Sequence, residues 1–83
     1  MKFYKYVNGF NYWDKIRDNK LNAIYINKFN SILFYKNSKL HNAKNASYIR
    51  IDGYKEFYLN EMLYDYKKDF NKKSWRRFVK MQV

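Results

Sequence analysis

The 83-residue sequence predicts a single α+β domain, residues 1–83, in which a twisted antiparallel β-meander of hairpins is covered by one or two C-terminal helices. Short segments rich in aromatic and β-branched residues alternate with turn signals, which is typical of hairpins. The spacing of apolar residues becomes helical in the last third of the chain. Two or three isolated hairpins are marginal in water, so this sheet needs a helical cover.

Composition limits what can stabilise such a small domain. The chain has no Cys, which excludes disulfides and thiolate zinc sites and fits a reducing, cytoplasmic setting. Aromatic residues make up 23% of the sequence, far more than a disordered segment would carry. We therefore expect the packing of rings to supply most of the stability.

The charge balance predicts the class of partner. Lys and Arg number 18 against 7 Asp and Glu, giving a formal net charge of +11, which attracts nucleic acid, acidic protein surfaces or anionic lipid. Part of this basicity is also what an AT-rich genome would impose through Lys and Asn codons. No apolar run approaches the roughly 20 residues of a spanning helix, so we expect no membrane span.

The chain opens with a predicted hairpin. Residues 3–7 read as a strand, Asn8-Gly9 as a two-residue turn, and residues 10–13 as the returning strand. Asn-Gly is among the strongest sequence signals for such a turn.

A 23-residue repeat follows the predicted hairpin. An offset of 23 lays residues 23–45 over residues 46–68 and gives eight identities, whereas this composition would give about two at a random offset. The identical pairs are Ala23 and Ala46, Tyr25 and Tyr48, Ile26 and Ile49, Phe34 and Phe57, Tyr35 and Tyr58, Asn37 and Asn60, Leu40 and Leu63, and Lys44 and Lys67.

The repeat unit reads as strand, turn, strand, turn. Residues 46–51 alternate, Asp52-Gly53 signals a two-residue hairpin turn, and residues 54–59 read as a second strand. Phe29-Asn30 takes the place of Asp52-Gly53 in the first copy, and Asn tolerates the left-handed backbone of such turns. We thus assign residues 1–59 to the hairpin sheet.

Residues 60–83 form a basic segment with helical spacing. Ser74 is the expected N-cap of a short helix that begins at Trp75. The two halves of the segment do not share one apolar stripe, so we expect one bent helix or two short helices. The apolar residues with helical spacing are Leu63, Tyr66, Phe70, Trp75, Phe78 and Val79.

Residues 34–64 resemble the MORN-variant repeats of phage, large-virus and some bacterial proteins. This resemblance implies a β-meander that serves as an interaction surface, and it implies no catalytic residues. Asn37-Ser38 and Asn60-Glu61 replace the family's Asn-Gly, Asn45 replaces its Pro, and Tyr64 replaces its second His. The residues that carry the resemblance are Phe34, Tyr35, Asn37, Leu40, His41, Ala46, Asp52, Gly53, Phe57, Tyr58, Asn60 and Leu63.

Chemistry-bearing residues are few. His41 is the only histidine and has no evident partner to orient it, so we interpret it as a turn residue of the repeat. No phosphate loop, zinc pattern or nucleophile elbow is present, and we expect no catalysis, cofactor or metal. The carboxylates, which we interpret as solvated or paired with lysines, are Asp14, Asp18, Asp52, Glu56, Glu61, Asp65 and Asp69.

Two groups of residues are candidates for partner binding. Five cations follow Asp69 without any further acidic residue, interleaved with rings that could stack on bases; we favour docking on the sheet for Trp75, Phe78 and Val79. Tyrosines on an open sheet face would suit base stacking or a protein interface, although a covering helix would leave only some exposed. The candidates are Lys72, Lys73, Arg76, Arg77, Lys80, Tyr25, Tyr35, Tyr48 and Tyr58.

Together these features favour a non-enzymatic binding protein. We expect a phage or mobile-element inhibitor of a host nucleoprotein defence enzyme, anti-CRISPR-like in blocking an RNA-guided nuclease. Its partner would be an acidic protein surface or a nucleoprotein such as a CRISPR effector with guide RNA, in the host cytoplasm. Two alternatives remain: a module that binds RNA or single-stranded DNA directly, and a small toxin-like ribonuclease using Lys, Arg and Tyr.

Overall fold

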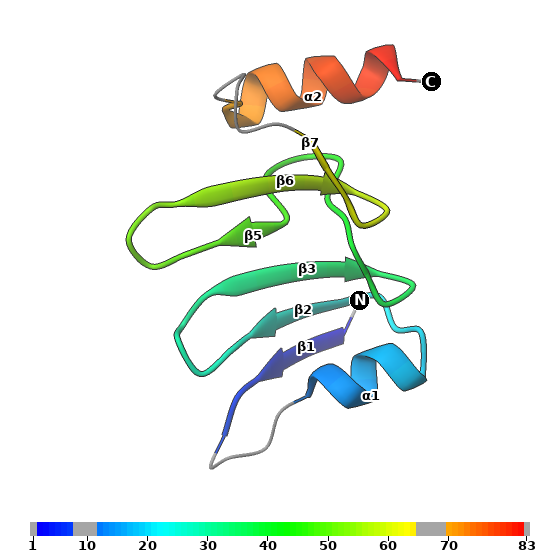
Figure 1. Cartoon of the computed structure of the whole chain (residues 1–83), viewed down its shortest axis with the longest axis vertical. Helices are drawn as coiled ribbons and strands as arrows, with labels where there is room; N and C mark the ends of the chain where they lie inside the picture. Colours follow the sequence, from blue (N-terminus) through cyan, green and yellow to red (C-terminus); the bar gives the residue numbers. More distant parts are fainter. Residues whose placement is uncertain (1, 8–11, 65–69, 83) are drawn as a thin grey trace.

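The computed structural model describes residues 2–7, 12–64 and 70–82 as a mostly antiparallel sheet with two helices (Figure 1). The predicted α+β class is confirmed. The strand order is β1-β2-β3-β5-β6-β7, and β4 pairs with β3 beside this path. The elements are β1 (Lys2–Lys5), α1 (Trp13–Asp18), β2 (Ala23–Ile26), β3 (Ile32–Lys36), β4 (Lys39–Leu40), β5 (Tyr48–Ile49), β6 (Lys55–Leu59), β7 (Met62–Tyr64) and α2 (Lys72–Met81).

The two copies of the 23-residue unit fold alike. Strands β2, β3 and β4 form the first copy, and β5, β6 and β7 form the second. The turn Asn37-Ser38 has φ values of 51° and 64°, and its counterpart Asn60-Glu61 has 50° and 70°. Left-handed backbone at both central residues is the type I′ geometry, whose twist matches that of a two-residue hairpin.

The Asp52-Gly53 turn is longer than predicted. The Gly53 N–H donates to the Arg50 carbonyl at 3.0 Å, and the Arg50 N–H donates to the Tyr54 carbonyl at 2.8 Å. A three-residue loop of this kind needs positive φ only at its last residue, which is Gly53 at 93°. Asn30, at 60°, takes that place in the first copy.

The predicted N-terminal hairpin is wrong where the structure describes it. Strand β1 pairs in parallel with β2, and the segment expected to return as a strand enters helix α1. Asn8-Gly9 lies outside the described residues. The helix buries Ile16 completely, and the centroid of its Trp13 ring lies 5.3 Å from that of Tyr35. The local alternation of residues 10–13 does not show that these side chains are needed in the core, because that depends on tertiary contacts.

The C-terminal segment also differs from the prediction. Residues 62–64 pair with β6 as strand β7, because the type I′ turn at Asn60-Glu61 reverses the chain. Tyr66 lies outside the described residues. The N-cap of α2 is Asn71 instead of Ser74: its side chain accepts the Ser74 N–H at 2.8 Å, and the Ser74 hydroxyl accepts the Asn71 N–H at 3.0 Å.

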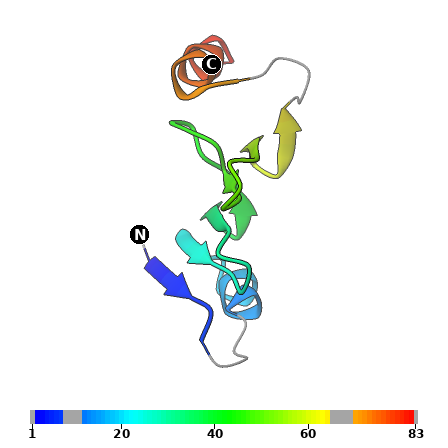
Figure 2. The same cartoon turned by 90° about the vertical axis from the view of Figure 1, so that its left-hand side faces the viewer.

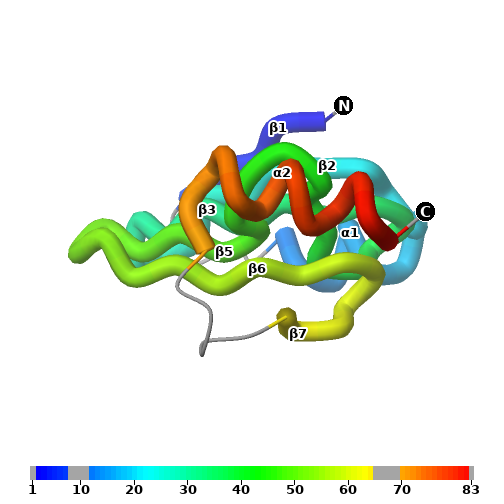
Figure 3. Tube along the Cα trace, turned by 90° about the horizontal axis from the view of Figure 1, so that it is seen from above, coloured from blue at the N-terminus to red at the C-terminus, as the bar shows by residue number. Residues whose placement is uncertain are grey.

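The two helices lie on opposite faces of the sheet (Figure 2). Register places Ala23, Tyr25 and Tyr35 on one face, which we call the first face, and there they pack with α1. Phe57 and Tyr64 lie on the second face, against Trp75 of α2. Figure 3 shows α2 running along β6.

Each helix therefore covers half of one face, whereas the sequence predicted a cover of C-terminal helix alone. The first face is open over β5 and β6. The second face is open over β1 to β3, where apolar side chains belong to neither buried cluster. These open side chains are Phe3, Ile24, Ile26, Ile32 and Phe34.

The turn geometry predicts that Ser38→Gly and Glu61→Gly each stabilise the protein. A left-handed backbone costs a non-glycine residue about 1–2 kcal/mol, and glycine removes this strain from the folded state. Glycine also has more conformational freedom in the unfolded chain, which offsets part of the gain, so the net stabilisation should be about 0.5–1 kcal/mol. Urea unfolding measures it. Lys39→Gly, in strand β4, is the control and is expected to lower the free energy of unfolding; a loss in all three variants would contradict the assigned turns.

Candidate partner-binding surface

Helix α2 is fixed to the sheet by a buried tryptophan. The Trp75 side chain is fully buried, its ring centroid lies 5.0 Å from that of Phe57, and its Nε1–H donates to the Asn42 carbonyl at 2.7 Å. Phe78 and Val79 pack against the same cluster, as the docking interpretation expects. The rest of the helix surface therefore presents its side chains to solvent in a defined orientation.

That solvent-facing surface carries all five predicted cations, and we call it the α2 basic face. Among the described residues none of the five forms an ion pair. Cations four residues apart repel each other, and cations in the first turn oppose the helix dipole, so this pattern costs the helix stability. A polyanion would relieve both effects. The α2 basic face consists of Lys72, Lys73, Arg76, Arg77 and Lys80.

Arg76 also has a structural contact. Its Nε–H donates to the Lys44 carbonyl at 2.9 Å, which ties α2 to the loop of residues 41–44. Lys73 and Arg77, one position further round the helix, have no such hydrogen bond among the described residues. Variants at Lys73 and Arg77 therefore test the charge of this face more cleanly than variants at Arg76.

Two of the four predicted tyrosines are buried, so this fold does not present their side chains on an open surface. Tyr25 is 4% exposed and Tyr35 is 7% exposed. Both lie on the half of the first face that α1 covers, with Ile16 in the same cluster. Burial raises the pKa of Tyr35 to about 12.

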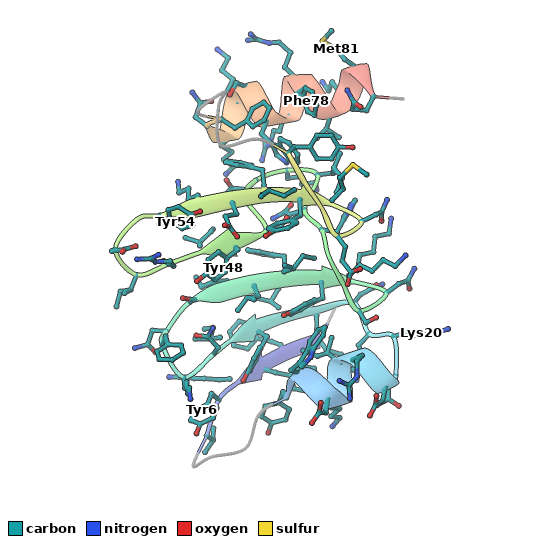
Figure 4. All side chains as sticks on the ribbon, in the orientation of Figure 1. Tyr6, Lys20, Tyr48, Tyr54, Phe78 and Met81 are labelled. Carbon is teal, nitrogen blue, oxygen red and sulfur yellow. The ribbon has the colours of Figure 1, made fainter. Side chains whose placement is uncertain are left out.

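The other two, Tyr48 and Tyr58, lie on the open half of the first face. The hydroxyls of Tyr54 and Tyr58 donate to Glu56 at 2.7 and 2.9 Å. The Tyr48 ring lies edge-on to that of Tyr54, and both residues are labelled in Figure 4. Burial, followed by the bond to Glu56, raises the pKa of Tyr58 to about 12. This patch contains a carboxylate and faces away from α2, so the fold does not join it to the α2 basic face.

His41 has a structural contact in the repeat's turn. Its Nδ1 accepts the Asn60 N–H at 3.1 Å, so that it links the first copy of the repeat to the second. Burial, followed by the charge of Lys36, lowers the pKa of His41. The ring is therefore neutral at pH 7, with its proton on Nε2.

The carboxylates do not gather in one place. Asp14 and Asp18 both pair with Arg17, and Asp52 pairs with Arg50. Glu61 lies in a turn, while Asp65 and Asp69 fall outside the described residues. In residues 2–7, 12–64 and 70–82, no group of three potential ligands that could hold a metal ion occurs.

Sequence reasoning missed a pocket between β3 and the loop of residues 41–44. The pocket has a volume of about 490 Å³ and lies on the open half of the second face, beside Phe34 and Lys36. The cationic spacing of α2 was visible in the sequence, but no local signal shows that this loop would stand over β3. Its lining residues are Asn22, Phe34, Tyr35, Lys36, His41, Asn42, Ala43 and Lys44.

Comparison of the chain with protein-family models, curated proteins and solved structures found no match. Within the described part of the chain, neither helix has the length and apolar character needed to cross a membrane.

The bond to Asn60 predicts that His41 makes stability depend on pH. The folded-state pKa of His41 is lowered, so the unfolded state binds the proton first as pH falls through about 6.5, and the free energy of unfolding should decrease. Urea midpoints at about pH 7.5 and about pH 5.5 measure the change. His41→Gln should flatten it, because His41 is the only histidine; an equal slope in this variant would contradict the assignment.

Proposed function

We propose that the protein is a non-enzymatic binding protein whose α2 basic face engages an acidic surface. The observation that carries the proposal is the set of five exposed cations on one rigid helix, without ion pairs among the described residues. Opposite charge steers association and fixes orientation more than it adds affinity. Such a face suits rapid capture of a polyanionic target.

The partner that we propose is a nucleoprotein enzyme, for example an RNA-guided nuclease, which the protein blocks. Such an enzyme holds a guide RNA, whose phosphates would attract a small basic protein. The small size of the chain supports this choice of partner, since its principal extents are 39 × 28 × 17 Å.

Charge reversal on α2 tests the assigned face. Lys73→Glu/Arg77→Glu should weaken partner capture by about tenfold or more while the fold stays intact, because neither side chain forms an ion pair within the described part of the chain. Arg76→Glu/Arg77→Glu should weaken it similarly, with some loss of stability from the broken bond to Lys44. Circular dichroism and urea unfolding separate the two effects.

Lys20→Glu/Lys28→Glu is the matched control, because it changes net charge equally; Lys20 lies near α1, at the other end of the molecule (Figure 4). Capture from lysates with an RNA-guided nuclease, with and without nuclease digestion, and inhibition of target cleavage are the measurements. Equal capture by the α2 variant and the control would remove the assigned face. Capture that disappears after digestion would show that nucleic acid, and not protein, is the partner.

A further inference from the structure

The lining of the pocket beside β3 includes one half-buried phenylalanine ring, that of Phe34. Phe34 and Lys36 project to the same face of β3, since they are two residues apart. Phe34 belongs to neither buried cluster, and no ring of the described residues stacks on it. At about 490 Å³ the pocket is within the range of small-molecule sites.

The charged residues in the lining of the pocket are all cations. Lys36 and Lys44 belong to the lining, and the neutral His41 ring keeps an Nε2–H, because its Nδ1 accepts from Asn60. The lining contains no carboxylate among the described residues. A ligand that satisfies this site carries a flat apolar ring together with a negative charge.

The wall of the pocket is held in place before any ligand arrives. The Asn42 carbonyl accepts the Trp75 Nε1–H at 2.7 Å, the Lys44 carbonyl accepts the Arg76 Nε–H at 2.9 Å, and the Asn42 N–H donates to the Tyr58 carbonyl at 3.2 Å. These bonds fix the loop at both ends. Such preorganisation reduces the entropy that binding must overcome.

The pocket also adjoins the α2 basic face. The Arg76 bond to the Lys44 carbonyl joins this loop to the helix, so that basic residues follow one another from Lys36 through Lys44 to α2. An aromatic ring on which a base can stack, next to a row of basic residues that contact the phosphates, is the arrangement that binds single-stranded nucleic acid without sequence preference. An acidic peptide would match the positive charge, but it carries no base that could stack on the half-buried Phe34 ring.

We propose that this pocket binds a nucleotide, with its base on Phe34 and its phosphate at Lys36 and Lys44. The nucleotide is either free or one unit of a single strand that continues along α2. The inference does not rest on the proposed function, since the pocket can hold a nucleotide whatever the α2 basic face contacts.

Binding of a labelled single strand tests the proposal. A short fluorescein-labelled oligouridylate and the matching oligothymidylate are titrated by fluorescence polarisation, and uridine and adenosine monophosphates by NMR. Phe34→Leu should weaken binding by roughly five- to hundredfold, the range that loss of one base stack corresponds to, and Phe34→Trp should restore it. Phe29→Leu, the same change at an exposed phenylalanine in the β2–β3 loop, should leave the dissociation constant unchanged.

The salt dependence of binding tests whether Lys36 and Lys44 contact phosphates. Lys36→Gln/Lys44→Gln should lower the slope of log affinity against log salt by about 0.7 for each phosphate that the protein no longer neutralises, and Lys20→Gln/Lys28→Gln should not. Mononucleotide binding that depends on Phe34 identifies a free-nucleotide site; binding of oligonucleotides alone identifies a subsite for a strand.

The inference would be overturned by equal affinities for Phe34→Leu and Phe29→Leu, by equal binding of double- and single-stranded RNA, or by binding only of an acidic aromatic peptide. NMR spectra establish that each variant is folded. Lys73→Glu/Arg77→Glu distinguishes the two proposals, because it should lose partner capture while keeping the mononucleotide site. Loss of mononucleotide binding in that folded variant would also overturn the inference.

Discussion

The placement of every surface that we assign to binding depends on one buried contact, the docking of Trp75. Its indole fills the space beside Ala46 and Phe57, and its Nε1–H satisfies a carbonyl of the loop between the two repeats. A buried N–H without a partner is costly, so this bond sets the depth and rotation of the helix as well as its position. The same loop forms the wall of the pocket, which links the helix to β3.

Ala23 and Ala46 show how one repeat accommodates two helices. They occupy matching positions and both are fully buried, one with Ile16 of α1 and the other with Trp75 of α2. A small residue there gives each helix room to approach. The helices nevertheless lie on opposite faces, because the first cluster uses Tyr35 and the second uses Phe57, and these rings come from adjacent positions of the repeated aromatic pair. Half of each face remains open as a result.

Acidic and basic side chains are also divided between the two faces of the sheet. Glu56 and the carboxylates of α1 lie on the side of the first face, where the tyrosine hydroxyls and Arg17 hold them. Lys5, Lys36 and Lys55 project from the second face, on which α2 also lies. An isologous dimer through the second face would oppose like charges, so a partner of opposite charge suits it better. The helix keeps its repelling cations despite their local cost, which is the pattern expected where a surface serves binding.

Local chemistry determined much of this structure. Neighbouring residues determine the Asn-Ser and Asn-Glu turns, the alternating strands and the basic helix, because turn geometry and the spacing of apolar residues depend on preferences within a few positions. The sequence also identified the five α2 cations. It could not show that Tyr25 and Tyr35 are buried while Tyr48 and Tyr58 lie at an open face, since identical residues in a repeat receive different neighbours. Tertiary structure alone decided the parallel pairing of β1, the side on which each helix docks, and the pocket at Phe34, because these depend on contacts between segments far apart in the chain.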